Sequence, residues 1–524
     1  MKKLLYTFLI LAIAILWSSC RKDFVTVPSS GQLEFSRDTV YLDTIFSNIG
    51  SSTYNLKVYN RSDDDIHIPT IQLGEGQTSK YRLNVDGIAG KVFQDVELLA
   101  NDSLFIFVET TVDVNDFSSG DQFLYTDAIE FDNGGNQQKV ELVTLVQDAV
   151  FLYPQQFDDG TIETLLLGVD DEGNETRIEG FFLEDTELNW TNDKPYVIYG
   201  YAAIGQNKVL NIDAGARIHF HANSGLIVAN EGSLQVNGTT STTEDLEGEV
   251  IFEGDRLEPG FANVPGQWGT IWLTDGSTNN IINHATIKNA SVGILTENSD
   301  GTSNPTLTLN SSQIHNSATV GLLARTGNVE ATNTVIGSAG QASLYCNLGG
   351  KYTFTHCTFA NYWRNSFRVF PTVLLDNYID FGDGSPILTE VLEANFSNCI
   401  IDGNNGIELI LDKNESTDLI YKFENCSIKF DDFQNRFAND ALYNFNNDTI
   451  FDEVDIVTNS TTFDFKNPEA NEFIIGTNSG AVGIGNESTT TMFAPFDILG
   501  TMRTSAPNGK TDAGAYQNIP FGDD

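Results

Sequence analysis

Positive charge is scarce in this 524-residue chain, in which 28 lysines and arginines face 72 aspartates and glutamates, for a formal net charge of −44. Proteins that bind nucleic acid present a positive surface to the phosphates, so this balance excludes nucleic acid as a partner. Cysteine is also rare, and the 5 residues form no CxxC pair, which argues against a zinc site. By contrast, 45 glycines and 35 phenylalanines favour strands and tight turns over helices. The composition therefore predicts an all-β protein.

Long apolar runs are absent beyond the first residues of the chain. The run from Leu4 to Leu16 follows two lysines and is too short to cross a bilayer, which needs about 20 residues. It ends in Trp17-Ser18-Ser19-Cys20, which resembles the bacterial lipobox. This resemblance implies a lipoprotein signal peptide at 1–19 and a lipid on Cys20 that anchors the chain to a membrane. The alternative is an ordinary signal peptide with an unrelated cysteine.

The residues after Cys20 bear on the location of the protein. Arg21-Lys22-Asp23 loosely resembles the charged export signal of surface lipoproteins of the Bacteroidetes. The resemblance implies an outer-membrane lipoprotein exposed on the cell surface, with 20–30 as its tether.

Two architectures follow along the chain. From 31 to 150, short alternating segments such as 54–59, 103–108 and 139–143 are separated by polar turns, which predicts an immunoglobulin-like β-sandwich. Residues 151–194 are acidic and irregular, and we expect them to be a connector. From 195 to 517 the period of the sequence changes.

A hexad recurs in this second part, with an apolar residue first, a small residue fourth and an apolar residue last. Its copies begin at Ile282, Leu309, Ala331, Phe354, Phe396 and Phe423. The steps between copies are 27, 22, 23, 42 and 27 residues, and most of them match one coil of a parallel β-helix. The step of 42 allows either two coils or one coil with a long excursion.

Stacked coils bring equivalent residues into columns, so the small residue of each hexad should point into the interior. Cys357, Cys399 and Cys426 would then be packing residues that share one column with Ala285, Ser312 and Thr334. An Asn at the bend tolerates a left-handed backbone and can bond its neighbours in the stack. A disulfide between Cys399 and Cys426 is the alternative.

Two further motifs lie near the two ends of this region. Gly266-Gln267-Trp268-Gly269-Thr270-Ile271 and the closing segment Asp512-Ala513-Gly514-Ala515-Tyr516 resemble those of exported bacterial right-handed β-helix proteins with the pectate-lyase-like fold. The resemblance implies an all-β chain, with a right-handed parallel β-helix after the immunoglobulin-like sandwich. It implies a fold and no activity.

Many such proteins act on acidic polysaccharides and carry recognisable catalytic signatures. The Asn-Thr-Asp, Gly-His-Gly and Arg-Ile-Lys segments of polygalacturonase-like hydrolases are absent, and cations for a lyase base are few. Calcium is conceivable as a bridge to an acidic sugar, but no specific motif supports it. We therefore expect a non-enzymatic surface protein that is structural or contacts a glycan; the alternative is a polysaccharide lyase, hydrolase or epimerase with an unrecognised site.

The best candidate for glycan contact is the stretch from Asn361 to Asn395. Aromatic rings can stack on the faces of sugars, and arginines beside them can donate hydrogen bonds to the sugar hydroxyls. The glycan-binding candidates are Trp363, Arg364, Arg368 and Tyr378. The alternative is that Trp363, Phe367 and Phe370 pack this stretch onto its coil. His219 and His221 share one face of a strand. They could be metal ligands, or they could be the outward polar residues of an ordinary alternating strand.

Overall fold

The protein is described by a computed structural model that covers residues 25–117, 122–132, 134–169, 173–298, 301–382, 384–458 and 463–521. It divides into two compact units, Met1–Asp148 and Ala149–Asp524. The predicted signal peptide and Cys20 lie outside the described residues. Within the described ranges, no helix is long and apolar enough to cross a membrane.

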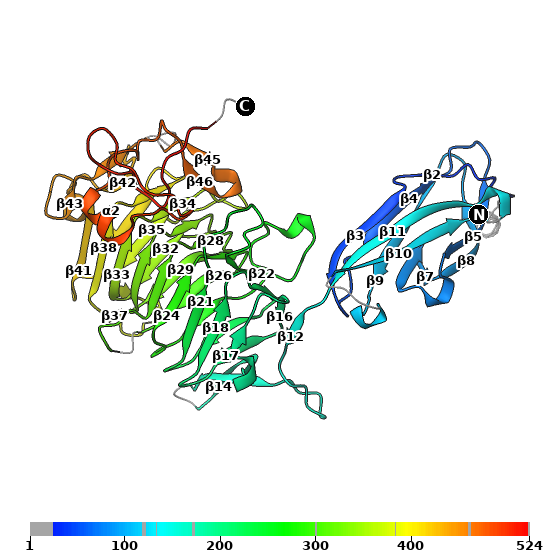
Figure 1. The fold of residues 1–524 in the computed structure, drawn as a ribbon, viewed down its shortest axis with the longest axis horizontal. Coiled ribbons are helices and arrows are strands. Elements are labelled where there is room, and N and C mark those ends of the chain that lie inside the picture. The colour runs from blue at the N-terminus through cyan, green and yellow to red at the C-terminus, as the bar shows by residue number, and fades with distance from the viewer. Residues whose placement is uncertain are drawn as a thin grey trace, which may run out of the picture. The chain divides into compact units, whose positions relative to one another are not determined.

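The first unit is a sandwich of two sheets around one apolar core (Figure 1). One sheet contains β1 (Val27–Pro28), β5 (Ile66–Leu73), β10 (Gln122–Phe131), β11 (Gln138–Gln147), β3 (Thr39–Phe46) and β8 (Val92–Leu98). The other contains β2 (Glu34–Phe35), β4 (Tyr54–Tyr59), β9 (Ser103–Thr110), β6 (Tyr81–Val85) and β7 (Ile88–Gly90). Alternate side chains of the longer strands β4, β9 and β11 enter the core, as the alternation in the sequence predicts.

The second unit is a parallel β-helix with three long sheets (Figure 1). Sheet 1 contains β15 (Asn189–Trp190), β18 (Val209–Asp213), β21 (Ser233–Asn237), β24 (Asn280–Asn283), β27 (Leu307–Asn310), β30 (Asn328–Thr332), β33 (Gly350–Thr355), β38 (Leu392–Ser397), β41 (Leu419–Glu424) and β43 (Phe451–Asp452). Sheet 2 contains β12 (Val150–Leu152), β16 (Tyr196–Ile198), β19 (Arg217–Phe220), β22 (Val250–Gly254), β25 (Ala285–Lys288), β28 (Gln313–His315), β31 (Val335–Gly337), β34 (Thr358–Asn361), β39 (Ile400–Gly403), β42 (Ser427–Lys429) and β44 (Asp455–Val457).

Sheet 3 positions the candidate site and contains β13 (Thr164–Val169), β14 (Glu175–Phe182), β17 (Tyr201–Ile204), β20 (Gly225–Val228), β23 (Ile271–Leu273), β26 (Val292–Thr296), β29 (Val320–Arg325), β32 (Leu344–Asn347), β35 (Val373–Asp376) and β40 (Leu409–Asp412). Two small antiparallel pairs, β36 (Tyr378–Ile379) with β37 (Leu388–Thr389) and β45 (Phe465–Asn467) with β46 (Glu472–Ile475), lie outside the coils, as does helix α2 (Glu487–Phe493). Short 3-10 turns occur at Gly76–Thr78, Val114–Asp116, Gly134–Asn136, Asp185–Glu187, Pro259–Phe261, Ala441–Tyr443 and Pro468–Ala470. The predicted fold, an immunoglobulin-like sandwich followed by a right-handed parallel β-helix, is confirmed.

The hexad marks the corner between sheets 1 and 2. Its third residue has a positive φ in every copy, at His284, Ser311, Asn333, His356, Asn398 and Asn425. One left-handed residue turns the chain sharply from one sheet into the next, and Asn adopts that backbone more readily than most residues do. The fourth residue then points inward, and Cys357, Cys399 and Cys426 have no exposed surface. All three are free thiols, so the predicted packing role is confirmed and no disulfide joins Cys399 to Cys426.

Two expectations about the coils are settled by strand pairing. β34 pairs directly with β39, so the step of 42 residues is one coil with a long excursion. The acidic stretch 151–194, expected to be an irregular connector, instead supplies early strands of the β-helix, because β12 pairs with β16 and β14 pairs with β17. That prediction was wrong because β14 carries three exposed charged residues, Glu175, Arg177 and Glu179, which conceal the pattern of a strand near the end of a sheet.

A C-terminal segment, residues 484–516, returns along the corner between sheets 1 and 2. We call it the strap. The side chains of the left-handed corner residues hold it: Asn425 donates to the Ile484 carbonyl at 3.0 Å, and Asn333 donates to the Phe496 carbonyl at 2.8 Å. His356 contacts the Thr490 hydroxyl at 2.8 Å between these two points. The polar residues that the corners require therefore also anchor the end of the chain.

Candidate functional site

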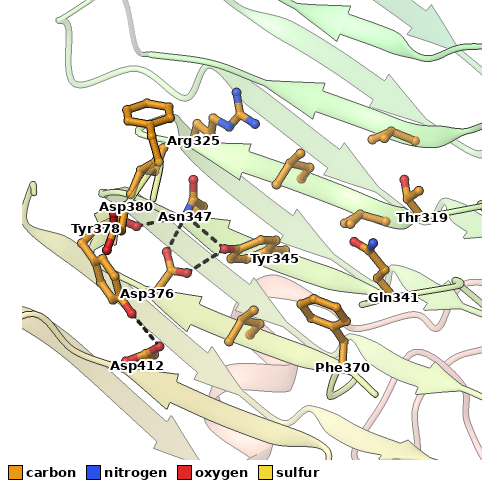
Figure 2. A pocket seen from close by; sticks show the side chains of 16 residues that line it. Thr319, Arg325, Gln341, Tyr345, Asn347, Phe370, Asp376, Tyr378, Asp380 and Asp412 are labelled. Carbon is orange, nitrogen blue, oxygen red and sulfur yellow. Dashed lines mark hydrogen bonds between the residues drawn. The ribbon is translucent and has the colours of Figure 1, made fainter. Parts of the chain in front are cut away.

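A groove of about 730 Å³ lies on the outer face of sheet 3. Five neighbouring strands, β26, β29, β32, β35 and β40, form its floor, and the β36 segment with Phe370 forms its sides (Figure 2). Because successive residues of a strand face opposite sides of the sheet, the outward residues of stacked strands form columns. One such column is apolar and aromatic, and in strand register it runs Leu295, Leu323, Tyr345, Leu374 and Ile410.

The next outward column is polar and ends in two carboxylates. In register it runs Arg325, Asn347, Asp376 and Asp412, at the carboxyl ends of their strands. Arg325 lies 3.6 Å from Glu297, and its Nε atom is buried without a hydrogen-bond partner among the described residues. The floor of the groove therefore presents an apolar column beside a column of hydrogen-bonding groups.

Asp376 is the buried member of the carboxylate pair. The Tyr345 hydroxyl donates to its Oδ2 at 2.7 Å, and the Asn347 amide donates to its Oδ1 at 2.6 Å (Figure 2). Burial raises the pKa of Asp376 to about 6, although these hydrogen bonds oppose the shift. Burial and the neighbouring Asp376 also raise the pKa of Tyr345, which therefore stays protonated and donates.

Asp412 is exposed and sits in register with Asp376 on the neighbouring strand. The Tyr378 hydroxyl donates to its Oδ2 at 2.9 Å, and this hydrogen bond raises the pKa of Tyr378 to about 12. Parallel strands lie about 4.8 Å apart, so two carboxyl groups with different surroundings occupy neighbouring positions on one face. Such a pair can accept hydrogen bonds from the hydroxyls of a ligand, and one of its members can carry a proton near neutral pH.

Of the four predicted glycan contacts, the structure places only Tyr378 in this groove. Arg364 is exposed elsewhere on the excursion and pairs with Glu469. Trp363 is 7% exposed, and its Nε1 donates to the Ser366 hydroxyl at 2.9 Å. The four residues therefore form no single site, and the packing alternative holds for Trp363 but not for Phe367, which is 89% exposed.

Arg368 corrects the prediction most clearly. Its side chain is 1% exposed and donates from Nη2 and Nη1 to the two carboxylate oxygens of Glu408, at 2.6 and 2.9 Å. Glu408 is fully buried and also accepts from the backbone and the hydroxyl of Thr372. Arg368 cannot touch a glycan, because a buried charge requires a partner and this loop folds inward to reach one.

The polar residues on the floor of the groove were missed by sequence reasoning. Asn347, Asp376 and Asp412 each end an apolar strand of sheet 3, and this recurrence was the available signal. It was obscured because their strands lie outside the hexad that revealed the coils.

His219 and His221 make different contacts in the structure. His219 is 5% exposed and contacts the Gly254 carbonyl at 3.2 Å, whereas His221 pairs with Asp255. In the part of the chain that the structure describes, no three His, Cys, Asp or Glu side chains are grouped as metal ligands.

Comparison with known proteins gives only distant likenesses. No protein-family model matches the chain, and no curated protein matches its sequence. PapD-like domain 7 of human CEP192 is 12% identical over 25% of this chain and 94% of that one, with a TM-score of 0.15. The catalytic unit of a GH87 α-1,3-glucanase from Streptomyces thermodiastaticus is 10% identical over 71% of this chain, with a TM-score of 0.16. The chain spans 62% of that glucanase, and likenesses at this level leave function to be argued from the groove.

Proposed function

We propose that the chain is a lipid-anchored protein of the outer cell surface whose β-helix binds a glycan in the groove on sheet 3. The observation that supports this most is the pairing of the two outward columns, one apolar and aromatic, the other rich in carboxylates and amides. The faces of sugar rings pack on apolar and aromatic side chains, while their hydroxyls need donors and acceptors at the edge. Both requirements are met side by side over several coils.

The charge of the groove selects among glycans. Asp376, Asp380 and Asp412 line it against a single cation, Arg325. A carboxylate or sulfate on a sugar would meet repulsion here, and the net charge of −44 on the whole chain adds to it. The proposed ligand is therefore an uncharged glycan.

Binding is tested by measuring retention on an array of surface glycans, followed by calorimetric titration of the best ligand. We expect Tyr378→Ala and Asp412→Asn each to weaken binding by about tenfold or more, because a hydrogen bond to a charged group contributes about 1.5–3 kcal/mol. Tyr153→Ala is the matched control, since Tyr153 is 66% exposed and lies outside the groove. Equal binding by all three variants would remove the groove as the site.

The anchor is proposed from the sequence of residues 17–20 alone. Cys20→Ser should release the protein into the soluble fraction or leave its leader uncleaved, as followed by fractionation and the mass of the mature chain. Normal processing with unchanged membrane partitioning would contradict lipidation at Cys20. Protease treatment of whole cells tests surface exposure separately.

A second candidate function is glycoside hydrolysis, which the contrast between Asp376 and Asp412 favours. Paired carboxylates of this kind serve as acid and as base or nucleophile in glycosidases. Incubation with uncharged polysaccharides, with Asp376→Asn and Asp412→Asn as controls, tests it. Reducing ends that appear equally with wild type and both variants would exclude this pair as catalytic.

A further inference from the structure

A second recess, of about 750 Å³, lies on the outer face of sheet 3 toward its first strands. Residues of β14, β17 and the segments before β20 and β23 line it, and Val292 lines both this recess and the groove. The two hollows are therefore neighbours on one face of the same unit. Apart from Val292, the residues that line this recess are different from those that line the groove.

An aromatic ring forms the floor of the recess. Tyr201 faces outward in β17, and its ring passes over Gly225 and Gly269 on the following coils. A Cβ at Gly225 would lie 2.6 Å from Tyr201 Cε1, so a side chain there would displace the ring. The glycines thus let the ring lie along the sheet, where it is 7% exposed and packs with Leu165, Ala203 and Ile227.

An oriented histidine forms one wall. The His221 ring stacks on Tyr199, with ring centroids 4.5 Å apart and an angle of 28° between the rings. Its Nδ1 lies 2.7 Å from Oδ2 of Asp255, whose side chain is 9% exposed. The other ring nitrogen, Nε2, has no hydrogen-bond partner among the described residues, and the half-exposed ring lines the recess. Asp255 and Tyr199 therefore hold the imidazole with one hydrogen-bonding atom left for a ligand.

We propose that this recess is a second glycan subsite, in which an uncharged sugar ring packs against Tyr199 above the floor that Tyr201 fills, and one of its hydroxyls binds Nε2 of His221. The inference rests on the proposed glycan binding and adds a site that the carboxylate groove does not include. A chain of sugars that reaches from the groove past Val292 would occupy both hollows, which act as linked sites.

Proton uptake should regulate this subsite. The hydrogen bond to Asp255 raises the pKa of His221, and Glu179 adds to that effect. The charged groups that line or adjoin the recess are Arg177, Glu179 and Asp255. In the imidazolium form both nitrogens donate, and charge-assisted hydrogen bonds are stronger than neutral ones. Affinity should therefore fall as pH rises through the pKa of His221.

The test follows the Cε1–H NMR signal of His221 in the full chain while methyl glycosides of glucose, galactose, mannose and N-acetylglucosamine are added in turn. At least one glycoside should shift the signal and raise the titration midpoint of His221, since a ligand that prefers imidazolium stabilises it. Its affinity should fall about tenfold between roughly pH 5 and pH 8. His221→Gln should abolish this pH dependence, and Tyr199→Ala should weaken binding.

The controls separate this subsite from the groove. Asp412→Asn should leave the response of His221 to monosaccharides intact, because Asp412 does not line the recess. A His221 signal that no glycoside moves, or a shift that Tyr199→Ala leaves unchanged, would overturn the subsite even if the array shows binding in the groove. Conversely, if every groove variant still binds the array as wild type does, the groove is refuted as a glycan site, and the NMR result on the recess is unaffected.

Discussion

Removal of the Arg368 guanidinium tests the energetics of the excursion most directly. Arg368→Ala leaves the carboxylate of Glu408 fully buried without its cation, and also deprives the Phe370 carbonyl of a donor at 2.6 Å. Loss of one partner from a buried ion pair costs about 3–5 kcal/mol, because the remaining charge is neither solvated nor neutralised. We therefore expect a large drop in the stability of the β-helix unit.

The same excursion offers a matched control. Arg364 pairs with Glu469, but their side chains are 60% and 54% exposed, and exposed pairs contribute about 0–1 kcal/mol. Scanning calorimetry of the full chain, with Arg364→Ala beside Arg368→Ala, measures both effects on the β-helix transition. Arg368→Met combined with Glu408→Leu should recover much of the loss, because apolar residues of similar volume need no partner. Equal losses in the two single variants would refute this account of the loop.

Three further predictions concern stability. Trp363→Ala should cost about 3–5 kcal/mol in urea unfolding while glycan affinity stays unchanged, since the ring is a buried packing group; the reverse result would restore it as a glycan contact. Cys399→Ala should be tolerated far better than Cys399→Lys, and a bulky thiol reagent should not label the native protein, because the site has no exposed surface. The third concerns Asp376, whose pKa rises from 3.8 to about 6 on folding, so the native state keeps a proton that the unfolded chain releases. Its contribution to stability is therefore present below pH 3.8 and is lost as pH rises to about 6, a change of about 3 kcal/mol that Asp376→Asn should remove from a series of melting curves.

The coils could be predicted from the sequence because stacking repeats one local requirement. Each corner needs a residue that accepts a left-handed backbone, and each interior position beside it needs a small side chain. These two needs recur together at Asn398 and Cys399 and again at Asn425 and Cys426. A local pattern that recurs in every coil can be recognised in the sequence without knowledge of the contacts made by the rest of the chain.

The groove and the inward fold of the excursion could not be predicted in the same way, because both depend on partners far apart in sequence. Arg368 and Glu408 are 40 residues apart, and nothing local in the excursion shows that its arginine turns inward. Asp376 and Asp412 become neighbours only once the lengths of the intervening segments are known. Tyr378 was predicted because it is an aromatic residue in the stretch 361–395, where aromatic rings stand beside arginines.

The strap has a consequence for the order in which the molecule is completed. A solenoid held only by contacts between neighbouring coils can lose its last coil without disturbing the others. Here Arg503 donates to Asn333 at 2.9 Å across 170 residues of sequence, so the last part of the chain is fastened to a coil made much earlier. During synthesis, the polar corner side chains of the coils from Asn333 to Asn425 therefore lack their strap partners until residues 484–516 have been made. Loss of the strap should therefore let these coils fray one after another, whereas with it they open together.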